Sequence, residues 1–373
     1  MAVDGETRII GPWDKIKSSI GGVLLGLVLL PGAFVITCIA SKREQASEVF
    51  KGALPAAQAS KAAADKKAIF ATGTLDSEMI GDPQFVKPGR YLSLSRSAEM
   101  YAWEQKKETK KEKDGNTTIE KDVYDCKLTW TSKPDTNVGS KKGCEGKSNP
   151  SPTTSSASFT PGRVTINSSG TAYPVNPGKL DPVGLPGVKL SKNELTADLN
   201  EYSGSFYFKA ACAVSSPAAG CERVSFSGTS YKEGETYTVI GSLPAGQFEE
   251  YSTGKTGMMA GSWLKVGPGS FDAAMKAISS ADSKWTLGWF LGSVVCFWLG
   301  LTMLTGPILQ LIEFIPLIGG FGKGLIQVVF AVFSFVIMGL AFIIIEYFWV
   351  ILLLVVAIAA FLIYKKKSSP SAA

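Results

Sequence analysis

Two regions of the chain are almost free of charged residues, and the long stretch between them is polar. Residues 20–40 form the first apolar region and residues 285–364 form the second. The stretch between them is rich in Lys, Glu, Ser, Thr, Gly and Pro. A membrane-spanning helix needs about 20 apolar residues because lipid surrounds all its faces. This segregation predicts an integral membrane protein with one large polar domain.

The lengths of the two apolar regions predict four membrane spans. Residues 20–40 would measure about 31 Å as a helix, which matches the hydrocarbon core of a bilayer. Residues 324–364 would measure about 62 Å and carry one charge, Glu346, so we expect two helices that fold back there. The apolar segment 307–323, with Pro316 and a glycine pair, favours an interfacial loop. The predicted spans are 20–40, 285–306, 324–346 and 347–364.

Positive charge after the last span sets the predicted orientation. Lys365, Lys366 and Lys367 follow that span directly, and basic residues favour the cytoplasmic side. Basic residues stand at both ends of the first span, so this span favours neither orientation. A cleaved signal peptide is the alternative for the first apolar run, which is longer than a usual signal-peptide core. The predicted parts outside the bilayer are a cytoplasmic N-terminal tail at 1–19, an extracytoplasmic domain at 41–284, a cytoplasmic loop at 307–323 and a cytoplasmic basic tail at 365–373.

The polar domain shows the alternating pattern of β-strands. Residues 91–113 and 117–132 alternate apolar with polar side chains around Asp114-Gly115-Asn116, which is a strong signal for a β-hairpin. The aromatic residues predicted to pack the base of this hairpin, below a solvated Lys/Glu-rich tip, are Tyr101, Trp103 and Trp130. Further strand patterns occur at 205–211, 222–226 and 236–243, and a short helix is predicted at 271–280. This order of elements predicts an α+β membrane protein with a β-rich domain.

Four of the six cysteines lie in the polar domain, namely Cys126, Cys144, Cys212 and Cys221. In an exported domain four cysteines predict two disulfides, for which three pairings exist. We favour the two short-range pairs, Cys126 with Cys144 and Cys212 with Cys221. Free thiols in a reducing compartment are the alternative.

The available chemistry is limited because the chain contains no histidine. This absence excludes histidine-based triads and His-ligated metal sites. Carboxylates such as Glu222 are scattered, and no phosphate-binding loop, nucleophile elbow or CxxC pair is present. The net charge is only +6 and basic residues alternate with acidic ones, unlike a nucleic-acid-binding surface. We therefore expect neither an enzyme nor a bound cofactor, metal, nucleic acid or small-molecule substrate.

Two pairs of glycines in the predicted spans have the spacing that lets helices approach closely. They are Gly22 with Gly26, and Gly288 with Gly292. Packing among the protein's own helices is the simpler explanation, and a homo-oligomer is the alternative. None of the spans carries a charged pair, which argues against ion-coupled transport by a single chain.

Several short sequences occur in a fixed order along nearly the whole chain. They are AEMYAWE at 98–104, DG at 114–115, NPS at 149–151, RVSF at 223–226, YTVI at 237–240, STGK at 252–255 and WTLGW at 285–289. Together with the four-span layout they resemble the transmembrane protein 43 (LUMA) family. The resemblance implies a lumenal or periplasmic domain, an OB-like β-barrel element and no known enzymatic chemistry.

Animal members of that family lie in the endoplasmic reticulum and inner nuclear membrane, self-associate, and are linked to lamins and emerin. This chain departs from them in its Ser/Thr/Pro-rich middle, its four exported cysteines and its lack of histidine. These departures suggest a bacterial or otherwise distant member. The compartment expected from the resemblance is therefore a bacterial inner membrane with a periplasmic domain, or the endoplasmic reticulum or inner nuclear membrane of a eukaryote.

A large domain without a catalytic motif, mounted on spans nearly free of charge, favours a role in binding. We expect a membrane scaffold or chaperone-like organiser that binds other membrane proteins through its extracytoplasmic domain and its helices. We also expect the chain to associate with itself in the lipid bilayer. An oligomeric ion channel or stress-gated pore is the first alternative, and an extracytoplasmic envelope sensor is the second.

Overall fold

The computed structural model describes most of the chain, and the described residues form two compact units. The first unit comprises Met1–Ile10, Gln45–Thr253 and Ser262–Ala281, and the second comprises Gly11–Glu44, Gly254–Gly261 and Asp282–Ala373. The described residues are 3–10, 12–114, 117–196, 199–202, 206–209, 212–213, 215–257, 259–308, 319–348, 350, 352–353 and 356–358.

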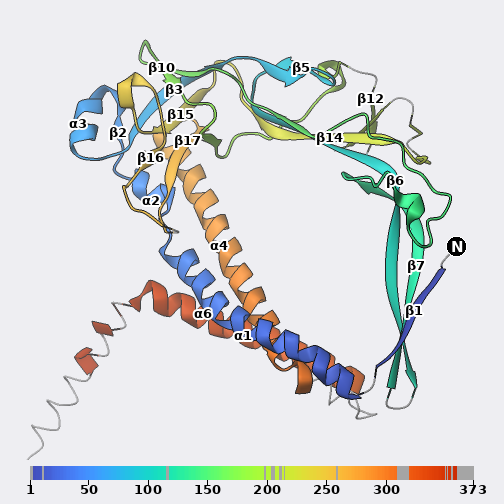
Figure 1. Ribbon diagram of the computed structural model, residues 1–373. Helices are drawn as coiled ribbons and strands as arrows, with labels where there is room; N and C mark the ends of the chain where they lie inside the picture. The colour runs from blue at the N-terminus through green and yellow to red at the C-terminus, as the bar shows by residue number, and fades with distance from the viewer. Residues whose placement is uncertain are drawn as a thin grey trace, which may run out of the picture. The chain divides into compact units, whose positions relative to one another are not determined.

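A seven-stranded sheet carries the predicted hairpin (Figure 1). Its strand order is β1-β7-β6-β14-β13-β12, and β8 also pairs with β6. Its strands are β1 (Val3–Ile10), β6 (Tyr91–Asp114), β7 (Thr117–Thr131), β8 (Ala157–Phe159), β12 (Leu199–Tyr202), β13 (Phe206–Lys209) and β14 (Glu222–Ser230). The predicted hairpin strands therefore correspond to β6 and β7, which are antiparallel.

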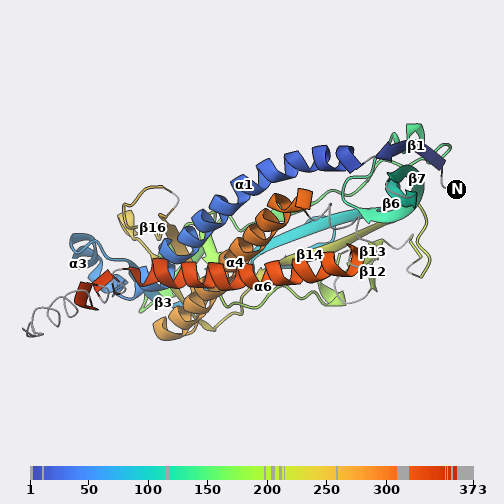
Figure 2. The same ribbon diagram turned by 90° about the horizontal axis from the view of Figure 1, so that it is seen from below.

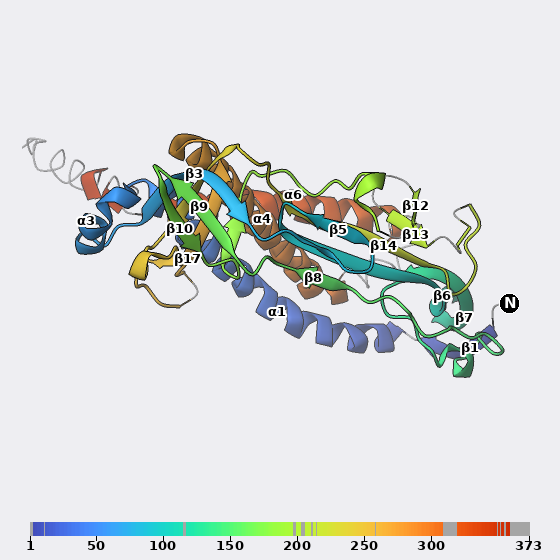
Figure 3. The same cartoon turned by 90° about the horizontal axis from the view of Figure 1, so that it is seen from above.

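An eight-stranded sheet forms the rest of the β-structure, and Figure 3 shows β10, β9 and β3 side by side in it. Its strand order is β10-β9-β3-β15-β17-β11, with β2 on β3 and β16 on β17. Its strands are β2 (Leu54–Pro55), β3 (Ile69–Ser77), β9 (Val164–Ser168), β10 (Thr171–Val175), β11 (Leu180–Pro182), β15 (Thr236–Gly241), β16 (Tyr251–Ser252) and β17 (Ser262–Pro268). A separate two-stranded ribbon pairs β4 (Ile80–Asp82) with β5 (Val86–Gly89).

The helices are few and differ greatly in length. They are α1 (Pro12–Lys42), α2 (Ala46–Phe50), α3 (Ala59–Ala64), α4 (Phe271–Leu304) and α6 (Gly319–Glu346). Short 3₁₀ turns lie at Ala56–Gln58, Val138–Ser140, Lys192–Glu194 and Pro244–Gly246.

The eight-stranded sheet owes its core to strands that are apolar on both faces. In β15, every residue after Thr236 is buried, and Val239 and Ile240 have no exposed surface. Val239 packs in one apolar cluster with Phe248 and Leu264, whereas Ile240 packs in another with Phe50 of α2. A strand in the middle of a sheet that is covered on both faces needs such a mostly apolar run, and the buried hydroxyl of Thr238 is hydrogen-bonded to Thr72 and to the Gly269 carbonyl.

A buried ion pair joins the small ribbon to the seven-stranded sheet. Arg96 of β6 donates from Nη1 to Asp82 Oδ2 at 2.6 Å, and both side chains are almost fully buried. Arg96 Nε also donates to the Ser155 carbonyl at 2.8 Å, and the guanidinium lies over the ring of Phe85. Two buried charges are tolerated only when they are paired and hydrogen-bonded, as they are here. The pair therefore fixes β4 against the first part of β6.

The second unit consists mainly of apolar helices, which Figure 2 shows from below. Ala33 of α1, Phe297 of α4 and Met338 of α6 are buried in one cluster. Most of their other large apolar side chains are exposed, as expected of helices that are surrounded by lipid. Among the described residues, three stretches are long and apolar enough to cross a membrane, namely Ile20–Phe50, Phe271–Leu304 and Gly324–Glu346.

The α+β class predicted from the sequence is confirmed, whereas the predicted number of spans is not. The helix expected at 271–280 and the span expected at 285–306 form one continuous helix, α4, which ends at Leu304. Of the expected interfacial loop, residues 309–318 lie outside the described residues, and 319–323 belong to α6. Many residues of the expected span 347–364, including all of 359–364, also lie outside the described part, as does the basic tail.

The two glycine pairs have different surroundings. A Cβ on Gly26 would lie 2.8 Å from the Gly300 carbonyl oxygen of α4, and one on Gly22 would lie 3.9 Å from the Met303 carbonyl oxygen. By contrast, a Cβ on Gly288 or Gly292 would meet no described atom within 4 Å. The first pair therefore serves close packing of α1 on α4 inside the chain.

This contrast supplies a matched pair of substitutions. Gly26→Val should destabilise the helix packing by about 1–3 kcal/mol, because the new side chain meets backbone atoms that cannot move aside. Gly288→Val makes the same chemical change in open space and should leave stability almost unchanged. Thermal unfolding of the full chain in detergent measures both effects. Equal losses in the two variants would contradict the described packing.

Candidate functional site at the base of the β6–β7 hairpin

The hairpin extends beyond β14 and β8, the strands that flank its β6 arm. β6 pairs with β7 from Met100↔Thr131 to Asp114↔Thr117, whereas β14 runs beside β6 only as far as Met100. The ten outermost residue pairs, from Gln105↔Cys126 onward, cover about 30 Å. Their side chains on β6 from 106 to 112 are exposed. The outer β6 arm is thus a row of charged, exposed side chains, whereas β1 lies along the outer β7 arm.

The ion pairs of this ribbon run between its strands. Lys107 Nζ lies 2.8 Å from Asp122 Oδ2, and Lys111 Nζ lies 2.7 Å from Glu120 Oε1. Hydrogen bonds from Lys107 and Thr109 hold the pKa of Asp122 below its ordinary value. In both pairs the lysine is exposed and the carboxylate is largely covered, and the pairs align the two strands.

Aromatic rings brace the base of the hairpin. Tyr101 and Trp130 are directly opposite in the register, and their ring centroids are 5.0 Å apart. Trp130 also meets Phe208 of β13 edge-on at 5.3 Å. The guanidinium of Arg223 lies 4.2 Å above the Trp130 ring, and its Nε donates to Glu99 at 2.7 Å. This stack joins two neighbouring strands of the sheet, β13 and β14, to the two arms of the hairpin.

Trp103 has a different environment from the other two predicted aromatic residues. Its backbone N–H donates to Asn149 Oδ1 at 2.8 Å, and Asn149 Nδ2 donates back to the Trp103 carbonyl at 2.9 Å. The ammonium of Lys147 lies 4.3 Å above its ring. Asn149 is buried, and its amide satisfies the backbone N–H and carbonyl of Trp103 as a neighbouring strand would. Trp103 therefore anchors the long loop after β7 rather than the aromatic stack.

The same loop is tied to the hairpin by a disulfide between Cys126 and Cys144, the first of the two pairs favoured from the sequence. The expected second disulfide is absent from the structure, in which Cys212 and Cys221 are free thiols. Both lie in the apolar cluster around Phe208, next to the aromatic stack. Burial, with a hydrogen bond from Cys221, raises the pKa of Cys212 to about 11, which keeps this thiol protonated.

A buried carboxylate, Glu222, lies beside this stack at the start of β14. Thr153 and Thr154 donate to it from their hydroxyls at 2.8 and 2.6 Å, and their backbone N–H groups donate as well. Lys209 Nζ of β13 lies 2.5 Å from the same carboxylate. Burial alone would raise the pKa of Glu222, but these hydrogen bonds outweigh it and lower the pKa to about 2. We call Glu222 with these three partners the carboxylate clamp.

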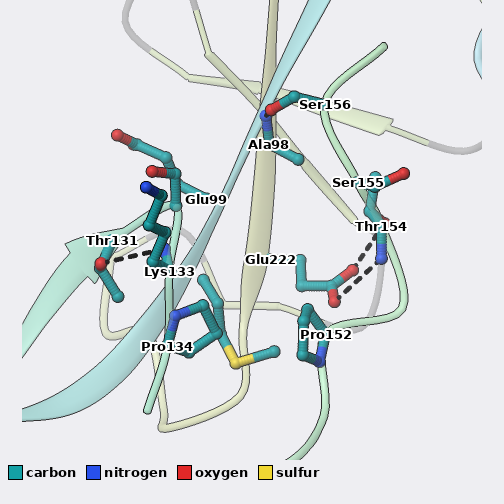
Figure 4. A pocket seen from close by; sticks show the side chains of 12 residues that line it. Ala98, Glu99, Thr131, Lys133, Pro134, Pro152, Thr154, Ser155, Ser156 and Glu222 are labelled. Atoms are coloured by element: carbon teal, nitrogen blue, oxygen red, sulfur yellow. Dashed lines mark hydrogen bonds between the residues drawn. The ribbon is translucent and has the colours of Figure 1, made fainter.

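A pocket of about 340 Å³ opens between the clamp and the hairpin base (Figure 4). β7 ends opposite Met100 and β8 begins opposite Arg96, so the two strands leave a gap along one edge of β6. In this gap the Ala98 N–H donates to Ser156 Oγ at 3.1 Å. Thr131, Ser132, Lys133 and Pro134 close one side, and Pro152 with Thr154, Ser155 and Ser156 closes the other.

The charged side chains around this pocket are mostly paired with one another. Glu99 is paired with Arg223, and Glu222 is paired with Lys209. Lys133 is exposed, and no ion pair of its side chain occurs among the described residues. Within the described ranges no three Cys, Asp or Glu side chains gather as metal ligands. A strand edge, a ring of hydroxyls and one lysine together suit an extended peptide with an acidic end or side chain.

A known family shares the part of the chain that holds the hairpin from Met100 onward, the clamp, most of the pocket, and the helices α4 and α6. The family model described as Transmembrane protein 43 matches residues 100–352, which is more than half of the chain. The chain belongs to the transmembrane protein 43 family. No curated protein and no solved structure matches it. Family membership and the apolar helices together make it an integral membrane protein.

The family resemblance found in the sequence is thereby confirmed, but the sequence did not reveal the clamp. Glu222 stood among scattered carboxylates, and its partners Thr153 and Thr154 are 69 and 68 positions away. Two of the short family sequences, NPS at 149–151 and RVSF at 223–226, flank the clamp on either side. Asn149 and Arg223 in these sequences contact the hairpin base directly.

The clamp predicts a specific dependence of stability on pH. The pKa of Glu222 in the folded protein lies below the unfolded value of about 4.3, so the carboxylate stabilises the fold above pH 4.3 and this contribution is lost as pH falls towards 2. Glu222→Gln should cost about 1–3 kcal/mol at neutral pH, because it removes charge-assisted hydrogen bonds in a buried site. The variant should also lose less stability than the wild type between pH 4.5 and 2.

Thermal unfolding of the full chain in detergent at several pH values measures this difference. Asp65→Asn, which removes an exposed carboxylate outside the clamp, is the control and should follow the wild-type profile. Parallel profiles for Glu222→Gln and the wild type would contradict the assignment.

Proposed function

We propose that this member of the transmembrane protein 43 family is a membrane scaffold. It would bind other membrane proteins through its β-rich domain and would catalyse no reaction. The observation that carries the proposal is the hairpin, whose base is braced by a disulfide, an aromatic stack and a buried carboxylate while its outer part lies exposed. Such bracing has no purpose in a solvated loop, but it suits a surface that must keep its shape.

A rigid ribbon is well suited to recognition because it loses little conformational freedom when a partner binds. The alternating lysines and carboxylates of its outer part would select partners by charge and would speed their encounter. The pocket beside Lys133 would provide a second contact, for an extended acidic segment of the same partner. Partner selection would thus depend on charge, in agreement with the mixed signs along the hairpin.

We place the β-rich domain outside the cytoplasm, with four spans and both termini inside, as the lysines at 365–367 favour. The compartment would be a bacterial inner membrane, or the endoplasmic reticulum or inner nuclear membrane of a eukaryote. The disulfide between Cys126 and Cys144 supports an oxidising compartment for the domain.

An oligomeric pore is the second candidate, and the open glycine pair of α4 favours it. Gly288 and Gly292 meet no described atom and share their exposed stripe with Leu291 and Val295, so a second copy could pack there. Reconstituted protein that conducts ions, with conductance reduced by Gly292→Val, would support a pore. Bilayers that stay electrically silent at every voltage and tension would remove this candidate.

Shortening the hairpin tests the scaffold. Residues 108–123 are replaced by Asn-Gly, which joins the paired positions Lys107 and Tyr124 and leaves Cys126 in place. Crosslinking and affinity purification in mild detergent should then recover membrane-protein partners from the wild type and at least about tenfold less from the shortened chain. This corresponds to a loss of about 1.4 kcal/mol or more in binding.

The matched control is the double variant Lys232→Ala/Glu235→Ala, which removes an exposed ion pair outside the hairpin. It should recover the same partners as the wild type. An unchanged partner set after shortening of the hairpin would show that the hairpin is not the binding surface.

A further inference from the structure

The outer edge of β7 is occupied by the N-terminal strand of the same chain. β1 runs antiparallel to β7, with Asp4 opposite Val123 and Ile9 opposite Ile119. Lys121 Nζ lies 2.6 Å from Asp4 Oδ2. With β1 in place Val123 is buried, and a hollow of about 290 Å³ beside it is lined partly by Asp4, Lys121 and Ile119. This edge therefore accepts an added strand, with backbone pairing and a charge contact.

α1 connects β1 to the membrane, and this connection decides whether β1 can lie on β7. α1 begins at Pro12, directly after β1, and its 31 residues measure about 46 Å as a helix. It is apolar from 20 to 40, and it is long enough to cross a bilayer of about 30 Å. It also packs closely on α4. A helix that crosses places the residues at its two ends on opposite sides.

The hairpin follows the C-terminal end of α1 in the chain, and β1 precedes its N-terminal end. The charged hairpin cannot pass through hydrocarbon to reach β1, because an open-edged ribbon would leave backbone groups unsatisfied there. In a chain whose α1 crosses, β1 and β7 are therefore on opposite sides of the membrane. The β7 edge is then open, and an open edge strand is a ready template for another strand.

We propose that the β7 edge, residues 118–124, is a strand-acceptor site for an extended segment of a partner membrane protein on the same side. This inference rests on the scaffold function proposed above and names how the partner binds. β1 shows the chemistry of the occupant: a carboxylate that reaches Lys121, followed five positions later by a β-branched apolar residue opposite Ile119. The occupant adds to the ribbon by β-augmentation, in the antiparallel direction.

A peptide with the sequence of β1 is the probe. The full chain is reconstituted in nanodiscs, and a fluorescent peptide Val3–Ile10 (VDGETRII) is titrated against it. The peptide should bind saturably to the wild type, and the chain with residues 108–123 replaced by Asn-Gly should bind none. Peptide carrying Asp4→Lys should bind the wild type about fivefold more weakly, since it exchanges an exposed ion pair for a repulsion.

Reversing the charge at position 121 separates loss of the ion pair from loss of folding. Lys121→Glu should reverse the preference, so that it binds the Asp4→Lys peptide better than the native one. Binding of the reversed peptide also shows that the variant is folded. Absence of saturable binding to the wild type, or the same charge preference in both chains, overturns the proposal.

A second experiment measures on which side of the membrane β1 and the hairpin lie. Glu6→Cys and Lys110→Cys are each introduced and labelled with a membrane-impermeant maleimide in sealed vesicles. They should react from opposite sides of the membrane. Reaction of both from the same side would mean that β1 fills the edge itself, which overturns the proposal. Partners that are lost on hairpin shortening, without peptide binding, would leave the scaffold standing and remove only the strand-acceptor site.

Discussion

The hairpin base depends on the neutralisation of one buried charge. A carboxylate without partners in the position of Glu222 would cost several kcal/mol, so the fold must bring donors to it. It does so with Lys209 of β13 and with the loop that holds Thr153 and Thr154. Glu222 is also opposite Met100 in the register, so the clamp sets where β6 leaves the sheet and the hairpin begins. The aromatic stack and the disulfide then act on a base that is already fixed.

The bilayer is the second constraint on the structure, because a helix that crosses it separates the chain segments before and after that helix. Apolar helices need no partner face in lipid, which explains why α1, α4 and α6 share only a small buried cluster. At one such place Gly26 of α1 lies close to Gly300 of α4. A crossing helix also separates the segments at its two ends, and this separation decides whether β1 or a foreign strand can lie on β7. Membrane topology thus controls the availability of a binding edge.

The sequence predicted the features that depend on neighbours along the chain. Alternation around Asp114-Gly115 predicted the hairpin, and apolar runs predicted the long helices, since both signals are periodic and local. The clamp could not be predicted because its polar partners come from segments about 70 residues apart. β1 was missed because eight residues with mixed charge resemble a tail until a partner edge is known. Cys212 and Cys221 are close in sequence but unbridged, and nothing in the local sequence distinguishes this pair from Cys126 and Cys144.

The outer hairpin is the surface through which we propose that this protein meets its partners in the membrane. A photo-crosslinking amino acid placed at Lys110, in the exposed outer part of β6, reports the neighbours of the hairpin directly in intact membranes. The same group at Glu233, an exposed position outside the hairpin, reports the background. The account predicts discrete crosslinks to other membrane proteins from position 110 that are absent from position 233. Crosslinks of equal yield and identity from both positions, or none from position 110, would contradict it.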